Sequence, residues 1–119
     1  MRPDAHDYAE LQTRLVAAAD DLAAMTKDVG ASRQIVEYDS DRRKRALAVA
    51  AVPFLAAGES ASAAEMQARA SKDYATAMGK LSRDYTTAQT VIAEWEAKRI
   101  LFETSRSLLS AHKITIANV

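Results

Sequence analysis

The stretch that decides the fold is "YATAMGKLSRDYTTAQTVIAEWEAKRILFETSRSLL", residues 74–109. Its apolar side chains return at alternating steps of three and four residues, the spacing that keeps one face of an α-helix turned toward a partner helix. We call such a row of positions a seam. The seam of this stretch consists of Tyr74, Met78, Leu81, Tyr85, Ala88, Ile92, Trp95, Arg99, Phe102, Arg106 and Leu109. The pattern predicts a long, coiled-coil-like helix.

A helix over Ser71–His112 would be roughly 60 Å long at about 1.5 Å per residue. A compact domain of this chain length is only about 35 Å across. The excess length predicts that other copies of the chain cover part of the seam. The residues expected at such an oligomer interface are Met78, Leu81, Tyr85, Ile92, Trp95, Arg99, Phe102, Arg106 and Leu109. Arg99 and Arg106 have two interpretations: they specify the register or ring, or their stems lie on the seam while their heads reach water.

A second seam lies near the N-terminus and ends at Gly30, because glycine is a common residue just after a helix. Pro3 and Asp4 suit the start of this helix. The seam consists of Tyr8, Leu11, Leu15, Ala18, Leu22, Met25 and Val29. The spacing predicts a helix over about residues 4–29.

The middle of the chain is less regular. A seam continued from Ile35 passes through Tyr38, Arg42, Arg45, Val49 and Val52. Pro53 is expected to kink or end this helix, which we place at about 32–57. The run "SAAE" at residues 62–65 has capping-box spacing and predicts that the last helix begins there, over about 62–112. The tail, 113–119, is too short to classify.

These elements predict one all-α domain, residues 1–119, in which a long C-terminal helix packs against two shorter N-terminal helices and the chain is oligomeric. Apolar residues make up 49% of the chain, charged residues 27%, and there is no cysteine. His6 and His112 stand in no metal-ligand spacing, and no motif activates a nucleophile. We therefore expect no enzymatic activity, no catalytic residue, no metal and no cofactor.

The charge and the apolar runs bear on location and partners. The longest apolar run, Ala46–Ala57, is too short to cross a bilayer, and the N-terminus lacks a signal-peptide pattern, so a cytoplasmic protein without a membrane partner is expected. Residues 1–40 carry four basic and eight acidic side chains, whereas residues 41–80 carry seven and four. This asymmetry favours self-association or a local anionic partner.

Four consecutive cations, Arg42, Arg43, Lys44 and Arg45, dominate the basic middle. On a helix they fan over about 300°. Acids three or four residues upstream, Asp39 and Asp41, can pair with all four, so one interpretation is a solvated, self-compensated turn. The other is a polyanion site that an oligomer repeats many times. In that interpretation the four cations contact phosphates, with Lys72, Lys80 and Arg83 as weaker candidates.

The order of these features is similar to that of the UvsY-like family of phage recombination mediators. An acidic amphipathic N-terminal helix precedes a basic run, an alanine-rich segment that ends in glycine, and a long last helix with "RSLLSAHKI" near its end. The similarity covers roughly residues 35–116. In one respect the chain departs from the family: "LAVAAVPFLAA", residues 47–57, carries no charge where the family has basic residues.

The resemblance implies a small helical protein that forms rings and binds single-stranded DNA. Its partners would be a recombinase and the single-strand-binding (SSB) protein whose coated strand receives that recombinase, in the host cytoplasm if the chain is phage-encoded. The alternative is a phage-type helical scaffold or inhibitor that binds another protein through its seams.

Overall fold

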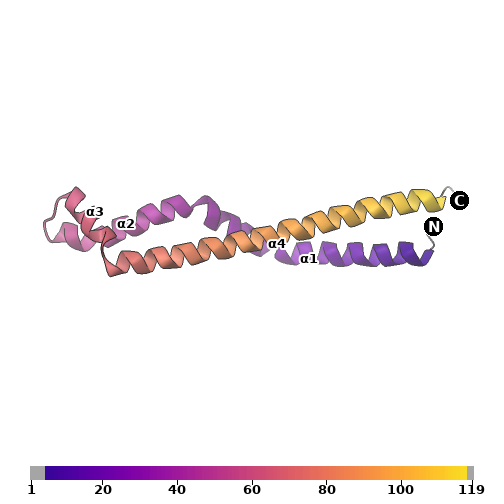
Figure 1. Cartoon of the computed structure of the whole chain (residues 1–119), viewed down its shortest axis with the longest axis horizontal. Helices are drawn as coiled ribbons and strands as arrows, with labels where there is room; N and C mark the ends of the chain where they lie inside the picture. Colours follow the sequence, from indigo (N-terminus) through magenta and orange to yellow (C-terminus); the bar gives the residue numbers. More distant parts are fainter. Residues whose placement is uncertain (1–4, 118–119) are drawn as a thin grey trace. The chain divides into compact units, whose positions relative to one another are not determined.

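The computed structural model describes the backbone of residues 5–117 and the side chains of residues 7–111. The described chain is all α-helical: α1 is Ala5–Glu37, α2 Asp39–Ala56, α3 Ala61–Arg69 and α4 Lys72–Ala117 (Figure 1). The all-α prediction, with a long C-terminal helix against shorter ones, is confirmed. Contacts group the chain into two units. Unit 1 holds the described residues up to Gly30 and from Val91 onward, and unit 2 is Ala31–Thr90.

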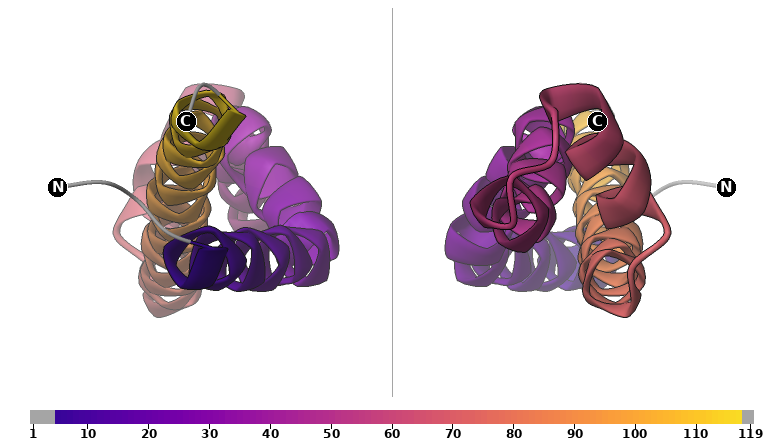
Figure 2. Two further views of the ribbon diagram at one scale, coloured as in Figure 1. Left: turned by 90° about the vertical axis from the view of Figure 1, so that its right-hand side faces the viewer. Right: turned by 90° about the vertical axis from the view of Figure 1, so that its left-hand side faces the viewer.

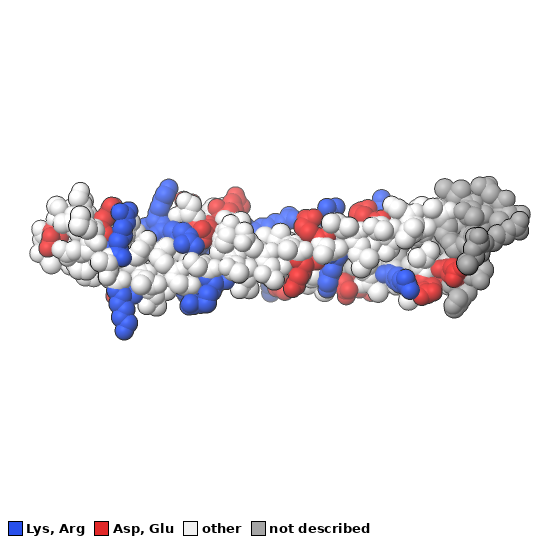
Figure 3. Space-filling view, in the orientation of Figure 1, with Lys and Arg blue, Asp and Glu red and all other residues white. Residues whose placement is uncertain are grey.

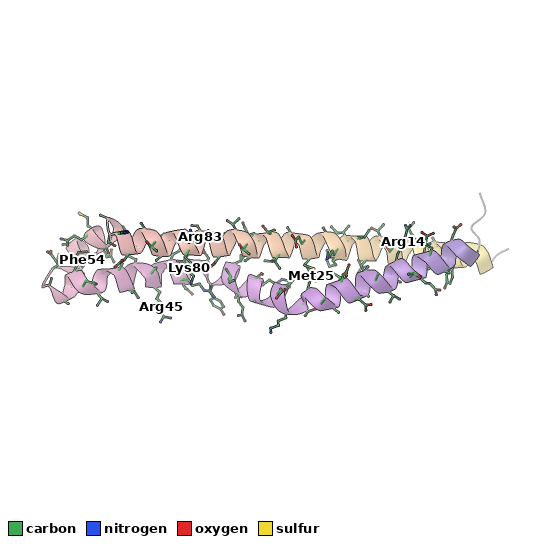
Figure 4. All side chains as sticks on the ribbon, turned by 90° about the horizontal axis from the view of Figure 1, so that it is seen from below. Arg14, Met25, Arg45, Phe54, Lys80 and Arg83 are labelled. Carbon is green, nitrogen blue, oxygen red and sulfur yellow. The ribbon has the colours of Figure 1, made fainter. Side chains whose placement is uncertain are left out.

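Unit 1 is a pair of antiparallel helices, α1 and the C-terminal part of α4 (Figures 1 and 2). The predicted seam of α1 is confirmed, because its positions are half-buried or buried and the other described residues of 7–30 are exposed. Val29, at 5% exposure, is the most buried of them. Met25 lies between the two helices (Figure 4). On α4, Ile92, Trp95, Phe102 and Leu109 are half-buried, and these are the seam residues that pack here.

Unit 2 is built around a sharp corner between α2 and α3, which bend by 120° (Figure 2, right). The core of this corner consists of small side chains: Ala51, Ala64 and Ala68, of which the last two are fully buried. Leu47, Ala50 and Phe54 pack against them, and Figure 4 shows Phe54 at this end of α2. Alanine is the residue that lets two helix backbones approach closely while both stay helical.

Two residues shape the corner. Pro53 lies inside α2 and, because proline has no N–H group, cannot donate to the carbonyl one turn earlier; the helix ends at Ala56. Gly58, with φ +92°, then reverses the chain, and the N–H groups of Gly58 and Glu59 donate to the carbonyls of Leu55 and Phe54 at 3.0 and 3.1 Å. This is the Schellman arrangement of a helix C-terminus.

The start of α3 corrects the capping prediction at residues 62–65. Ser60, two residues earlier, is the N-cap: its Oγ accepts a hydrogen bond from the Ala63 N–H at 3.2 Å. Ser71 plays the same part for α4. Its Oγ accepts from the Tyr74 N–H at 3.2 Å and donates to the Ala68 carbonyl at 2.6 Å. The expected single helix over 62–112 is thus two helices, because Ser71 starts a new one.

The expected end of the first helix, at residue 29, also differs from the structure. The first helix continues through Gly30 to Glu37, because Gly30 keeps an ordinary helical φ and the turns on either side continue the backbone ladder. Interior glycine costs a helix only about 1 kcal/mol. The tail, left unclassified, is helical as far as Ala117. The roles expected for Pro3 and Asp4 lie outside the described residues.

Gly30 has a helical φ and Gly58 a positive φ, so substitutions at these two glycines form a matched test. At Gly30 an added methyl group meets nothing within 4 Å, so we expect Gly30→Ala to raise the free energy of unfolding by about 0.5–1 kcal/mol. Gly58→Ala places a side chain at φ +92° and should lower it by about 1–2 kcal/mol. Urea unfolding at equal protein concentration measures both, and equal effects of the two variants would contradict the assignment.

Ser71 gives a second test. Replacing it with alanine leaves the Tyr74 N–H and the Ala68 carbonyl without this partner, so we expect Ser71→Ala to destabilise the protein by about 1 kcal/mol. Ser107→Ala is the control, because Ser107 is exposed inside α4 and alanine is the better helix former there. Thermal unfolding followed by circular dichroism compares the two. A loss of stability as large in Ser107→Ala would show that the cap is not the cause.

Candidate nucleic-acid interface

The basic run lies on α2, just after a bend in the helical backbone. Tyr38 has φ −97° and ψ 11°, outside the regular helix, yet its N–H donates to the Gln34 carbonyl at 2.9 Å. The Arg42 N–H donates to the Tyr38 carbonyl at 2.9 Å. The hydrogen-bond ladder therefore passes through the bend, and the four cations begin within the first turn of α2 with helical spacing.

The seam of α1 runs on into α2, but not through the residues expected from sequence. The positions that continue its three-and-four spacing are Ser32, Val36, Asp39, Arg43, Ala46 and Ala50, all half-buried or buried. The expected path through Tyr38, Arg42 and Arg45 is exposed, and so are Val49 and Val52. The prediction was wrong here, because the sequence pattern did not show that Asp39 and Arg43 pair and occupy seam positions.

Arg43 is the cation that turns inward. Its Nε donates to Oδ2 of Asp39 at 2.8 Å and its guanidinium also donates to the Ser82 hydroxyl of α4 at 3.3 Å. The Arg43 side chain is 36% exposed and that of Asp39 20%. The second carboxylate oxygen of Asp39 is buried without a partner among the described residues. This pair holds α2 against α4 within unit 2, so Arg43 has a side-chain hydrogen bond across the two helices that the other three cations lack among the described residues.

The remaining cations of the run face solvent. Arg42, Lys44 and Arg45 are exposed, and within the described side chains none of them makes an ion pair with an acid. The expected pairing of Lys44 and Arg45 with Asp41 is therefore absent from the described residues. Of the self-compensated turn, only the Asp39–Arg43 pair is formed.

A groove of about 380 Å³ between α2 and α4 of unit 2 gathers some of the predicted cations. Arg42 and Arg45 line it from α2, and Lys80 lines it from α4. Its other lining residues are Ala46, Val49, Ala50, Pro53, Asp73, Ala77 and Leu81. The groove thus combines three cations and one acid with an apolar floor. Figure 4 shows Arg45 extending outward from the α2 ribbon.

The other predicted cations lie elsewhere. Lys72 is exposed in the first turn of α4 and Arg83 lines a separate shallow hollow with Ser82, Thr86 and Thr87. Sequence reasoning did not assign a groove to Val49, Pro53 or Asp73. The signal was present, because Arg42, Arg45 and Val49 follow one another at steps of three and four residues.

We call the exposed row Tyr38, Arg42, Arg45, Val49 and Val52 the α2 stripe. Its large apolar side chains are exposed to solvent: Tyr38 is 49%, Val49 63% and Val52 58% exposed. An aromatic ring and two guanidinium groups thus share one face of α2. Unit 2 also carries nine Lys and Arg against seven Asp and Glu, and Figure 3 shows basic side chains projecting from its surface.

The residues expected at an oligomer interface are partly covered within the single chain. Met78, Leu81 and Tyr85 are half-buried in unit 2, as Ile92, Trp95, Phe102 and Leu109 are in unit 1. Arg99 and Arg106 are exposed. Arg99 lies 5.9 Å from the ring centre of Trp95 and pairs with Glu96 at 3.1 Å, so its stem lies along the seam while its charge reaches water.

The described residues offer no candidate metal centre. They contain no group of three or more metal-ligating His, Cys, Asp or Glu side chains, and the side chains of His6 and His112 lie outside them. No single described helix has the length and apolar content of a membrane span, although α2 and α3 taken together meet that test by length and composition. Comparison of the chain with protein-family models, curated proteins and solved structures found no match.

The inward position of Arg43 gives a prediction. Arg43→Ala leaves the Asp39 carboxylate partly buried without its cation, so we expect the free energy of unfolding to fall by about 1–3 kcal/mol. Arg42→Ala removes an exposed neighbour of the same chemistry and should change stability by less than about 0.5 kcal/mol. Urea unfolding measures the free energy of unfolding of both variants. Equal losses would mean that the Asp39–Arg43–Ser82 contact stabilises the protein no more than the exposed Arg42 does.

Proposed function

We propose that the protein binds single-stranded DNA without sequence preference, through the groove and stripe of unit 2. The observation that carries this proposal is that Arg42, Arg45 and Lys80 line one groove while Tyr38 stands exposed one turn before Arg42. Single-strand binders combine a cationic track for phosphates with aromatic rings on which bases stack. Seven cations were expected to contact phosphates. We now assign this part to the three that line the groove and to Lys44, which is their neighbour in sequence.

Arg43 has a different part in this proposal. Because Asp39 and Ser82 already hold its guanidinium, it positions α2 against α4 and contributes little free charge to the groove. Lys72 and Arg83 lie outside the groove and would contact only the flanks of a bound strand.

The wider role proposed is that of a recombination mediator, which helps load a recombinase onto SSB-coated strands in the cytoplasm. This part rests on the order of sequence features shared with UvsY-like mediators. The groove supports its DNA-binding step, whereas contacts with a recombinase or an SSB protein are expectations of that resemblance. The protein would act by binding alone, without catalysis or a cofactor.

A second candidate function has an observation of its own. Large apolar side chains are exposed on both units, among them Val49, Val52, Leu101 and Leu108. Exposed apolar faces on helices are typical of protein interaction sites. They favour a helical scaffold or inhibitor that binds another protein, and in that case the groove would receive an apolar helix in place of a DNA strand.

Fluorescence anisotropy with a labelled oligothymidylate separates the two candidates. For DNA binding we expect affinity to fall steeply between about 50 and 200 mM salt. The triple variant Arg42→Ala, Arg45→Ala, Lys80→Ala should flatten the plot of log affinity against log salt by about two units, because each lost phosphate contact removes about 0.7. Tyr38→Ala should weaken binding by about 1–3 kcal/mol at every salt concentration.

The control removes the same charge from unit 1, where Arg14, Lys98 and Arg106 are exposed. This triple alanine variant should keep the salt dependence of the parent. No binding at low salt, or an equal loss in both triple variants, would contradict the proposed groove.

A further inference from the structure

The outer face of α1 in unit 1 carries a row of exposed residues that complements the α2 stripe. Ala9, Thr13, Val16 and Asp20 follow one another at steps of three and four residues, and together they line a hollow of about 780 Å³. Val16 is 61% exposed, which is unusual for a valine inside a helix pair. We call this row the α1 stripe.

When the two stripes are aligned antiparallel, a valine faces a valine and an acid faces a cation. When Val16 stands opposite Val49, the same register places Asp20 opposite Arg45 and Thr13 opposite Val52. It also places Lys27 opposite Tyr38, a cation facing an aromatic ring. All of these residues are exposed, so each can reach a partner helix.

The charge of the two helices agrees with this register. The described part of α1 in unit 1 has five acids against two cations, whereas α2 has four cations against two acids. The cations of α2 lie in its first two turns and its apolar residues follow. On the α1 stripe the order is the reverse, with Val16 before Asp20, as an antiparallel contact requires.

The two stripes cannot form this contact within one chain. The point midway between each pair falls at residues 32–33, where a hairpin would have to reverse direction. Those residues lie inside α1, which continues to Glu37, and the backbone ladder passes on through Tyr38 into α2. In this register the facing stripe therefore belongs to another molecule.

From this complementarity we infer that the α1 stripe of one molecule docks antiparallel on the α2 stripe of a second copy, with Val16 against Val49 and Asp20 against Arg45. The inference does not rest on the proposed DNA function, but a docked copy and a bound strand would compete, because both use the α2 stripe. It assigns self-association to the outer faces of α1 and α2, whereas the seam of α4 is already partly covered within each chain.

Charge reversal tests the pairing on the full chain, by light scattering after size exclusion over a range of protein concentrations without DNA. Asp20→Arg and Arg45→Asp each place like charges opposite one another, so we expect each single variant to raise the dissociation constant of self-association at least about tenfold. The double variant exchanges the charges and should restore most of the lost association. Glu103→Arg, an exposed acid on α4, is the control and should associate as the parent does.

A monomeric parent, unchanged association in both single variants, or a double variant as weak as the singles would each overturn the inference. Helicity measured by circular dichroism verifies that every variant is folded. Asp20→Arg leaves all cations of the groove in place and removes the competing copy, so it should bind oligothymidylate at least as tightly as the parent does if the proposed function holds. Loss of association together with retained DNA binding supports this interface. If the parent protein does not bind oligothymidylate, the proposed function is contradicted but the association result is unaffected.

Discussion

The side-chain hydrogen bonds that join α2 to α4 in unit 2 come from the Asp39–Arg43–Ser82 cluster, a polar layer in the seam. Charged side chains at seam positions usually weaken helix packing, and they persist where they specify register. Here the layer lies directly after the bend at Tyr38. It holds one of four neighbouring cations inward and fixes the rotation of α2, so the faces presented by the other three follow from it.

That rotation decides the character of the outer surface. With Arg43 inward, helical spacing places Arg42 and Arg45 on one exposed face together with Tyr38 and Val49. The groove against α4 adds Lys80. A run of four cations that fans around a helix is a weak feature in a sequence. With Arg43 held by an acid and a hydroxyl, Arg42 and Arg45 fall on one face that has both charge and apolar area.

The α1 seam and most of the α4 seam could be predicted from sequence, because apolar residues at three-and-four spacing are typical of helices that pack against other helices. Three features could not. Gly30 does not end α1, since glycine stops a helix only where the next turns cannot continue it. The seam through Asp39 and Arg43 was missed because an ion pair carries no apolar signal. The cap at Ser60 was placed two residues late, because Ser60 and Ser62 both suit that role. At the site, sequence reasoning identified the cations, but only their distribution over the groove, the seam and the flanks separates their parts.

The alanine-lined corner of α2 and α3 has a consequence for how the protein folds. Its partners, Ala51, Ala64 and Ala68, are close neighbours along the chain, so closing it costs little loop entropy. Unit 1 instead joins segments from opposite ends of the chain. Contacts local in sequence form early, and distant ones wait for them. On a ribosome the corner can close while α4 is still being made, and α1 must wait as an exposed amphipathic helix until its partner emerges. During that interval the seam of α1 is open to any chaperone or neighbouring chain that recognises such a face.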